Sequence, residues 1–256
     1  MSDDPLHDWQ EWGIGLKQRP RLVVKLNSGR INRHYLLEAD DQRLVLRRNN
    51  PNTDALGINR AHEALILDRV SQAGLFPTII LSSIEKGLLI TEFVEGRFWK
   101  KSSLVHREKL VRLVDRLKEI HGIQLDLPAF DYLAHCENYW NTLLELDFSP
   151  TLALKQRHLL YLDMVKNIES SGELCHHDPI RSNIVESSGR LYFLDWEYAG
   201  CGWPSFDFAA LSHEWSIDPG MLCKLADCDN ATFSDAQFMY SHLCELWELI
   251  NKLQGS

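Results

Sequence analysis

Short apolar runs separated by turn residues dominate the first hundred positions of the chain. The runs are residues 21–26, 35–37, 43–47, 76–81 and 87–93. The first two links, residues 27–30 and 39–42, carry Asn, Ser, Gly and Asp, which are turn-forming residues. β-prone runs joined by such tight links are typical of antiparallel strands. We therefore predict a five-stranded antiparallel sheet in this part of the chain.

The remaining segments place apolar residues at helical spacing. They are residues 7–16, 58–74, 104–121, 131–146, 151–170 and 201–256, the last with a break around 227–234. Strands that come first and helices that follow indicate an α+β protein. We predict two lobes, with a sheet and one helix in residues 1–95 and a larger, mainly helical lobe in residues 96–256.

A β-hairpin is expected inside the helical part of the chain. Its two strand-like runs are residues 183–185 and 191–194, and residues 186–190 form the polar, Gly-containing link. Asp178 precedes the first run, Asn183 begins it and Asp195 follows the second run. Folding of the hairpin brings Asn183 and Asp195 together, and Asp178 faces the same space.

These three side chains suit phosphoryl transfer. The oxygens of Asn183 and Asp195 are hard ligands of the kind that Mg²⁺ prefers, and Asp178 is placed to accept a hydroxyl proton. A polar loop beside a hairpin explains any one of these residues, but the ordered set H-x-D-x-x-x-x-N followed by D is rarer. We predict Asp178 as the catalytic residue, with His176 beside it, and Asn183 and Asp195 as metal ligands.

One buried ion pair is also expected. Glu63 lies four and seven residues before Leu67 and Val70, so it points along the inward face of its helix. A buried carboxylate is costly without a partner. Arg47, at the end of the third strand, is the predicted partner, and the alternative is a Glu63 that lies in water at the rim.

Composition and charge argue against several classes of function. The chain has 256 residues, of which 45% are hydrophobic and 25% are charged, as is ordinary for a globular protein. Its net charge of −9 argues against nucleic acid as the main partner. No apolar run has a membrane span's length, and the acidic start predicts a cytoplasmic protein without a signal peptide. Six scattered cysteines without a C-x-x-C pair do not predict a zinc site.

The segments 174–185 and 194–200 resemble the aminoglycoside phosphotransferase and choline kinase superfamily. Its catalytic loop reads H-G-D-x-x-x-x-N, and the D-W-E-Y-A-G form here is similar to the choline, ethanolamine and thiamine kinase branch. His177 stands where Gly is usual, and Pro179 where an apolar residue such as Leu is usual. The resemblance implies a protein-kinase-like fold, ATP and Mg²⁺ as cofactors, and transfer of the γ-phosphoryl group to a small alcohol.

The resemblance also implies roles for further residues. The nucleotide-binding set would be Gly29, Asn32, Arg47, Glu63, and the hinge residues Glu92, Phe93 and Val94. Gly29 lies in a turn that resembles a phosphate loop but keeps a single Gly. His176 would brace Asp178 and the metal-binding segment. Asp207 is expected to cap the N-terminus of a helix.

Aromatic residues alternate with acidic ones after the hairpin. The candidate acceptor-binding residues are Trp196, Glu197, Tyr198, Trp203, Glu214 and Trp215, and Trp247 lies further on. Core packing is the default for any one of these aromatics. Together, an aromatic box with acidic neighbours suits a cationic acceptor such as choline, ethanolamine or thiamine.

Three alternatives stay open. One is the same fold with another acceptor, such as an aminoglycoside, methylthioribose or homoserine, and a pocket rich in carboxylates would favour it. The second is a nucleotide-binding pseudokinase, which has no need of Asp178. The third is a metal-dependent hydrolase built on His176, His177 and Asp178, which lacks further His ligands at useful spacing. The C-terminal region is short for a choline kinase, so a homodimer in which a second chain completes the pocket is also open.

Overall fold

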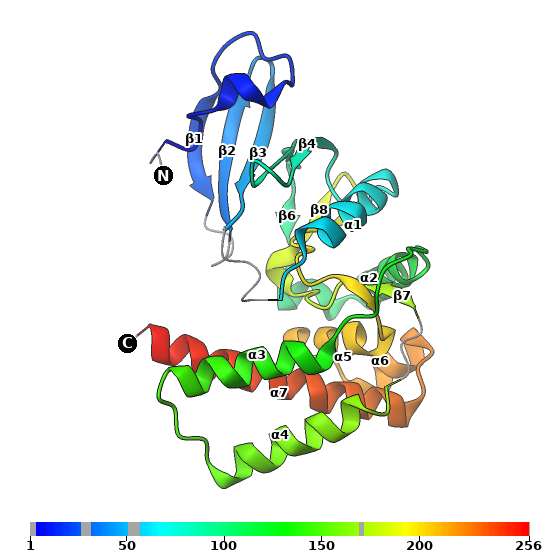
Figure 1. The fold of residues 1–256 in the computed structure, drawn as a ribbon. Coiled ribbons are helices and arrows are strands. Elements are labelled where there is room, and N and C mark those ends of the chain that lie inside the picture. Colours follow the sequence, from blue (N-terminus) through cyan, green and yellow to red (C-terminus); the bar gives the residue numbers. More distant parts are fainter. Residues whose placement is uncertain (1–3, 27–31, 51–56, 169–171, 256) are drawn as a thin grey trace.

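The computed structural model describes residues 4–26, 32–50, 57–168 and 172–255. An antiparallel sheet lies at one end of the molecule and a layer of long helices at the other (Figure 1). Its strands are β1 (Arg21–Leu26), β2 (Arg33–Ala39), β3 (Gln42–Arg48), β4 (Ile79–Ser83) and β5 (Leu88–Glu92), in the order β1-β2-β3-β5-β4. All four neighbouring pairs are antiparallel. The predicted five-stranded antiparallel sheet is confirmed.

The predicted helices after residue 58 are also present. They are α1 (Arg60–Gln72), α2 (Arg107–His121), α3 (Tyr132–Glu145), α4 (Leu152–Val165), α5 (Pro204–Trp215), α6 (Pro219–Ala226) and α7 (Asn230–Gln254). The helix predicted over residues 7–16 is wrong, because that segment holds one 3-10 turn, Trp9–Trp12. Gly13 ends this turn with a φ of +69°. Trp12 is buried with Leu6 in the core of the sheet. The helical spacing of apolar residues in this segment therefore reflects packing on the sheet rather than a long helix.

The predicted hairpin is formed by β8 (Ile184–Ser187) and β9 (Arg190–Phe193). Ser188 and Gly189 link the two strands with φ values of +49° and +77°, as the tight turns of two-residue hairpins require. The short strand β6 (Arg97–Phe98) pairs with β8. A second small sheet, which we did not predict, joins β7 (Glu173–Cys175) to β10 (Gly200–Gly202), and it holds together the two ends of the segment that contains Asp178, Asn183 and Asp195.

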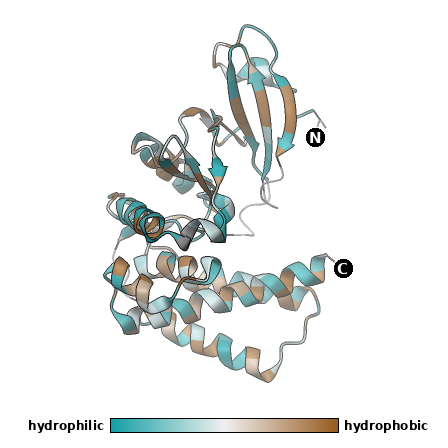
Figure 2. Ribbon diagram, turned by 180° about the vertical axis from the view of Figure 1, so that it is seen from behind, coloured by the Kyte–Doolittle hydropathy of each residue, from teal (hydrophilic) through white to brown (hydrophobic). Residues whose placement is uncertain are grey.

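Two buried cores stabilise the described residues. The smaller core lies between β2, β3, β5 and the N-terminal segment, and it includes Leu6, Leu37, Leu44 and Ile90. The larger core joins the helices, and α1 contributes Ile66 and Val70 to it. The long helices carry both hydrophobic and hydrophilic residues along their length, as burial of one helix face requires (Figure 2). The division into lobes near residue 95 stays a prediction, and among the described residues no helix has the length and hydropathy of a membrane span.

Candidate active site

The structure brings Asp178 and Asn183 into direct contact. The side-chain amide nitrogen of Asn183 donates to Asp178 Oδ2 at 2.9 Å and to the Asp178 carbonyl oxygen at 3.1 Å. The backbone N–H of Leu194, which precedes Asp195, donates to the carbonyl oxygen of Asn183 at 2.7 Å. The hairpin therefore gathers the loop and the ends of both strands, as the sequence predicts. Because the Asn183 nitrogen is engaged by Asp178, its amide oxygen is the atom left for a cation.

The environment of Asp178 raises its basicity. Burial, and then the negative charges of Asp195 and Glu214, raise the pKa of Asp178 to about 7, although the hydrogen bond from Asn183 acts in the opposite direction. A carboxyl group with a pKa near the working pH is well matched to accepting a proton from a hydroxyl group. The position of Asp178 and its raised pKa are therefore both suited to accepting a proton from a hydroxyl group.

Asp195 offers an oxygen atom that suits a metal ion. Its Oδ1 is buried and has no hydrogen-bond partner among the described residues. Burial raises the pKa of Asp195, while the charges of Arg47 and Arg60 act against that rise. A buried carboxylate oxygen without a partner is costly unless an ion binds it. Asp195 and the amide oxygen of Asn183 therefore fit Mg²⁺, which binds through few protein ligands.

His176 braces the segment through its ring. The Nδ1 atom accepts from the backbone N–H of Asp178 at 3.3 Å, so Nε2 carries the proton and donates to the Leu194 carbonyl oxygen at 3.0 Å. Burial lowers the pKa of His176 to about 4, which keeps the ring neutral. These contacts tie the Asp178 loop to the residue before Asp195, as expected for a bracing residue.

Asp207 has a different place from the one predicted. It lies inside α5 rather than at its N-cap, which is Trp203, so the capping prediction is wrong. Its buried carboxylate accepts from the backbone N–H groups of His176 and His177 at 2.9 and 2.7 Å, and it contacts His121 Nε2 at 2.9 Å. Burial acts to raise the pKa of Asp207, but the His121 hydrogen bond and neighbouring charges hold it below its usual value. Asp207 therefore positions the catalytic loop.

His177 adopts a backbone conformation that favours glycine. Its φ is +63°, which explains why Gly is usual at this position in the family that the sequence resembles. The ring is held on both sides, because Nδ1 donates to the Tyr198 carbonyl oxygen at 3.0 Å and Nε2 accepts from Tyr132 Oη at 2.8 Å. It also stacks on Phe130 at a centroid distance of 4.0 Å. A Cβ atom on Gly202 would lie 2.6 Å from His177 Nε2, so the close approach of β10 requires glycine there.

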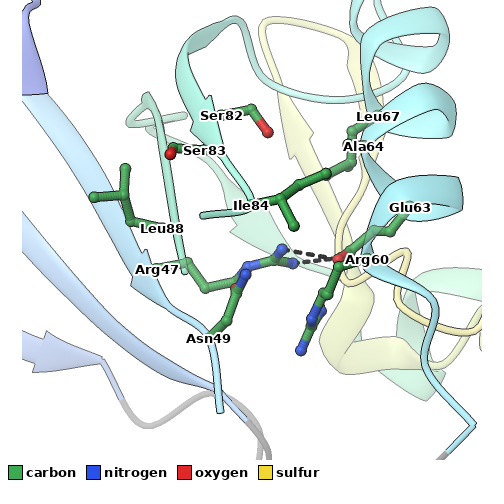
Figure 3. Close-up of a pocket in the computed structure, with 10 residues that line it drawn as sticks. All are labelled: Arg47, Asn49, Arg60, Glu63, Ala64, Leu67, Ser82, Ser83, Ile84 and Leu88. Atoms are coloured by element: carbon green, nitrogen blue, oxygen red, sulfur yellow. Dashed lines mark hydrogen bonds and ion pairs between the residues drawn. The ribbon is translucent and has the colours of Figure 1, made fainter. Parts of the chain in front are cut away.

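The predicted ion pair between Arg47 and Glu63 is confirmed. Arg47 on β3 donates to both carboxylate oxygens of Glu63 on α1, at 2.6 and 3.0 Å (Figure 3). The exposed fractions of the two side chains are 8% and 2%. Arg60, one turn earlier on α1 and missed by the sequence analysis, donates to Glu63 Oε2 at 2.6 Å. Two guanidinium groups therefore share one buried carboxylate.

Arg60 continues this network toward the catalytic segment. Its Nη2 donates to Asn32 Oδ1 at 2.8 Å, and Asn32 Nδ2 donates to Glu197 Oε2 at 2.7 Å. Burial, together with the charge of Asp195, raises the pKa of Glu197 to about 8. Asn32 therefore links β2 to the segment after Asp195. Gly29, the other predicted residue of this turn, lies outside the described residues.

A cavity of about 810 Å³ passes between the sheet and the helices, and Asp178, Asn183 and Asp195 lie in its lining. The predicted hinge residues Glu92, Phe93 and Val94 line it, as do Arg47, Val45, Leu89 and Thr91 from β3 and β5. The helical side supplies aromatic residues, which are Phe130, Tyr139, Tyr198, Phe206, Tyr240 and Trp247. The three catalytic candidates therefore share one cavity with the hinge and an aromatic wall.

The predicted acceptor residues divide into two groups. Glu197, Tyr198 and Glu214 line the cavity. Three tryptophans do not, and their assignment to the acceptor pocket is corrected. Trp196 is fully buried and its indole N–H donates to the Phe193 carbonyl oxygen at 2.8 Å. Trp215 packs edge-on against Trp99, and Trp203 packs against the helical core.

The sequence analysis missed most of the aromatic wall because its members look like core residues. Tyr240, Leu243, Cys244 and Trp247 lie on α7 at spacings of three and four, which is the pattern of a buried helix face. Tyr139 on α3 stacks with Trp247 at a centroid distance of 5.5 Å. This face of α7 lines a cavity instead of filling a core. A second chain completing the pocket, as in the homodimer considered above, stays a prediction.

Comparisons with known proteins show the family to which the chain belongs. The model of a family described as "Phosphotransferase enzyme family" matches residues 23–239. The LicA homolog of Mycoplasma capricolum is 26% identical over 51% of this chain and 52% of its own length. LicA of Haemophilus influenzae is 26% identical over 73% of this chain and 56% of its own length. Human ethanolamine kinase 2 is 26% identical over 59% of this chain and 44% of its own. The matches thus span about half the length of these relatives.

Solved structures share the fold. Choline kinase LicA from Streptococcus pneumoniae superposes with a TM-score of 0.73 at 22% identity, covering 91% of this chain and 88% of that one. A structure of LicA in complex with AMP gives a TM-score of 0.75 at 20% identity, covering 96% and 89%. The predicted protein-kinase-like α+β fold is confirmed.

Proposed function

The chain belongs to the phosphotransferase enzyme family, and on that premise we propose that it is an ATP-dependent kinase for the hydroxyl group of a small cationic alcohol. The observation that carries the proposal is the arrangement of Asp178, Asn183 and Asp195 at the cavity between the hinge and the aromatic wall. In-line transfer requires the phosphate donor, the metal and the acceptor hydroxyl to meet at one point. This cavity offers room for both substrates on either side of Asp178.

The nucleotide would occupy the side of the cavity nearest the sheet. The apolar side chains of Val45 and Leu89 line it, and residues 92–94 run along its edge as the hinge would. Arg47 would contact the phosphates while Glu63 holds its guanidinium group in place, because a bidentate pair fixes both orientation and charge. The structure of LicA with AMP supports a nucleotide site in this fold.

Mg²⁺ would be held by Asp195 and the amide oxygen of Asn183. Bound there, the ion would neutralise charge on the phosphates of ATP. The chain's own residues set the geometry, because the Asn183 nitrogen is fixed by Asp178 and the segment before Asp195 is fixed by His176. Asp178 would orient the acceptor hydroxyl group and accept its proton.

The acceptor would lie against the aromatic wall. Tyr139, Tyr198 and Trp247 line the cavity with aromatic rings, and Glu214 and Asp178 line it with carboxyl groups. Such a surface attracts an ammonium group through both ring quadrupoles and carboxylates. The lining has more aromatic than acidic side chains, which favours choline or ethanolamine over an aminoglycoside. Thiamine presents the same chemistry, a quaternary nitrogen with a primary hydroxyl group.

The proposal is tested by measuring ADP release from Mg-ATP with a panel of acceptors. The panel contains choline, ethanolamine, thiamine, methylthioribose, homoserine and kanamycin. We expect turnover with one of the first three. Turnover with methylthioribose, homoserine or kanamycin alone would keep the kinase and overturn an acceptor of the choline, ethanolamine or thiamine type. ATP binding without turnover on any acceptor would favour a pseudokinase, and a protein that binds no nucleotide would overturn the proposal.

The rate is expected to depend on the protonation of Asp178. Its pKa is raised to about 7 by burial and by Asp195 and Glu214, so the proton-accepting form is lost as pH falls through that value. We therefore expect kcat/KM for the acceptor to fall tenfold per pH unit at acidic pH, with one inflection below that value, because Mg²⁺ at Asp195 offsets one of the charges that raise the pKa. Steady-state kinetics with Mg-ATP saturating will measure it. A flat profile between about pH 5 and 8 would contradict a proton-accepting role.

A further inference from the structure

A cluster of one thiol and two imidazoles lies where three helices meet, outside the cavity. Cys136 belongs to α3, His158 to α4 and His242 to α7, and their exposed fractions are 0%, 5% and 0%. His158 Nδ1 lies 3.7 Å from Cys136 Sγ and 3.4 Å from His242 Nε2. The three side chains place their ligand atoms within 4.8 Å of one another. Three donors thus converge on one buried point.

Two of the three separations, 3.7 and 3.4 Å, match the edges of a tetrahedral metal site. Zinc binds thiolate sulfur at about 2.3 Å and imidazole nitrogen at about 2.0–2.1 Å. A tetrahedron with these bond lengths sets two nitrogens roughly 3.4 Å apart and a nitrogen and a sulfur roughly 3.6 Å apart. We propose that Cys136, His158 and His242 bind one Zn²⁺ ion, with a buried water molecule as the fourth ligand.

The surroundings of His158 support metal binding. Glu137 Oε1 lies 3.7 Å from His158 Nε2, the nitrogen that faces away from the centre. At His242, Glu245 Oε2 lies 4.0 Å from Nδ1 and is ion-paired with Arg157 at 3.1 Å, so Nδ1 has no hydrogen-bond partner among the described residues. Metal-bound histidines usually direct their second nitrogen to such a carboxylate, which orients the ring. Trp140 stacks on His158 at a centroid distance of 4.0 Å and an interplanar angle of 7°. The ring plane of His158 is therefore already set.

Two of the three proposed ligands, His158 and His242, have the neutral ring that metal binding needs. Burial lowers the pKa of His242 to about 4 and also lowers that of His158, so both rings are neutral near pH 7. Burial raises the pKa of the Cys136 thiol. Binding of Zn²⁺ would therefore convert this thiol to a thiolate and release one proton to solvent.

An ion at this point would tie α4 to α3 and α7. Tyr139 on α3 and Trp247 on α7 belong to the aromatic wall of the cavity, so the ion would stiffen the elements that carry that wall. This inference does not rest on the proposed kinase activity, because the cluster lies outside the cavity lining.

The test uses Co²⁺ as a spectroscopic probe on the full chain after treatment with a chelator. Saturating Mg²⁺ is present to occupy the site at Asn183 and Asp195. We expect one Co²⁺ per chain, visible-region bands typical of tetrahedral coordination, and a near-ultraviolet band from thiolate-to-metal charge transfer. Zn²⁺ should displace the Co²⁺ and remove these bands. The Cys136→Ser variant should lose the charge-transfer band, whereas Cys223→Ser, which alters a buried cysteine on α6, should keep it.

Further variants separate binding from folding. Glu137→Gln is expected to weaken Co²⁺ binding roughly tenfold, since it removes only the carboxylate beside His158. His242→Gln should abolish tetrahedral binding if Cys136→Ser does not fold. A wild-type chain that takes up no Co²⁺, or that shows no charge-transfer band, would overturn the proposal and leave a hydrogen-bonded trio. The same band in Cys136→Ser would also overturn it.

Discussion

The Asp178→Asn variant is expected to lose about 10²–10⁴-fold in kcat, the usual contribution of a positioned general base. Asparagine keeps the shape of the side chain and can still contact Asn183, but it cannot accept the hydroxyl proton. The KM for ATP should change little, because Asp178 lies at the acceptor side of the metal site. Initial rates of ADP release under saturating Mg-ATP and acceptor measure the effect.

The same variant should be at least as stable as the wild type. The pKa of Asp178 is raised in the folded protein, so its ionised form lowers the free energy of unfolding, fully so once the pH exceeds about 7. Asn carries no charge and removes this cost, so Tm at about pH 8 should be unchanged or higher. Asp235→Asn, an exposed position on α7, is the matched control for activity. A variant that retains more than about a tenth of the wild-type kcat would contradict the role of Asp178.

The Arg47→Met variant is expected to lose both stability and nucleotide binding. Breaking a buried pair leaves an uncompensated charge and typically costs about 3–5 kcal/mol of unfolding free energy. Because Arg60 still contacts Glu63 at 2.6 Å, we expect the lower end of that range. The KM for ATP should rise, since a phosphate-binding charge is lost. Urea unfolding and ATP titration measure the two effects separately.

A double variant distinguishes the structural role of this pair from its functional role. Arg47→Met combined with Glu63→Leu removes both charges of this pair but leaves the buried Arg60 with only the more distant Glu197 at 3.7 Å, so the unfolding free energy should recover in part relative to Arg47→Met alone. ATP binding should not recover, because the phosphate-binding cation is still absent. Recovery of both properties would show that Arg47 only neutralises Glu63. An equal unfolding free energy for the single and double variants would contradict a stabilising interaction between Arg47 and Glu63.

His177 stands where the family's motif has Gly, and the residues that accommodate its side chain lie far from it in the sequence. Its position requires a positive φ, which is a property of the loop itself. The side chain is tolerated because Tyr132 and Phe130 hold the ring and Gly202 leaves room for it. These partners come from other elements, so the sequence around His177 contains no sign of them.

The cysteines illustrate the same limit. Spacing along the chain did not predict a zinc site, because no two cysteines form a short motif. Cys136, His158 and His242 meet only because α3, α4 and α7 pack together. Spacing rules detect ligands that share a loop, whereas ligands from three helices have no characteristic separation in sequence.

By itself, the sequence determined the five strands of the main sheet, the helices after residue 58, the hairpin and the grouping of Asp178, Asn183 and Asp195. These features depend on local turn chemistry and on residues that one hairpin carries, so short-range patterns are sufficient. It also determined the partner of Glu63, since a buried carboxylate requires a cation and Arg47 was the candidate. The tertiary structure alone decided the rest. It gave Asp207 its place under the catalytic loop, joined Arg60 and Asn32 to Glu197, and turned one face of α7 into a cavity wall. Each of these is a contact between residues far apart in the chain, and packing of whole elements, rather than local preference, selects such contacts.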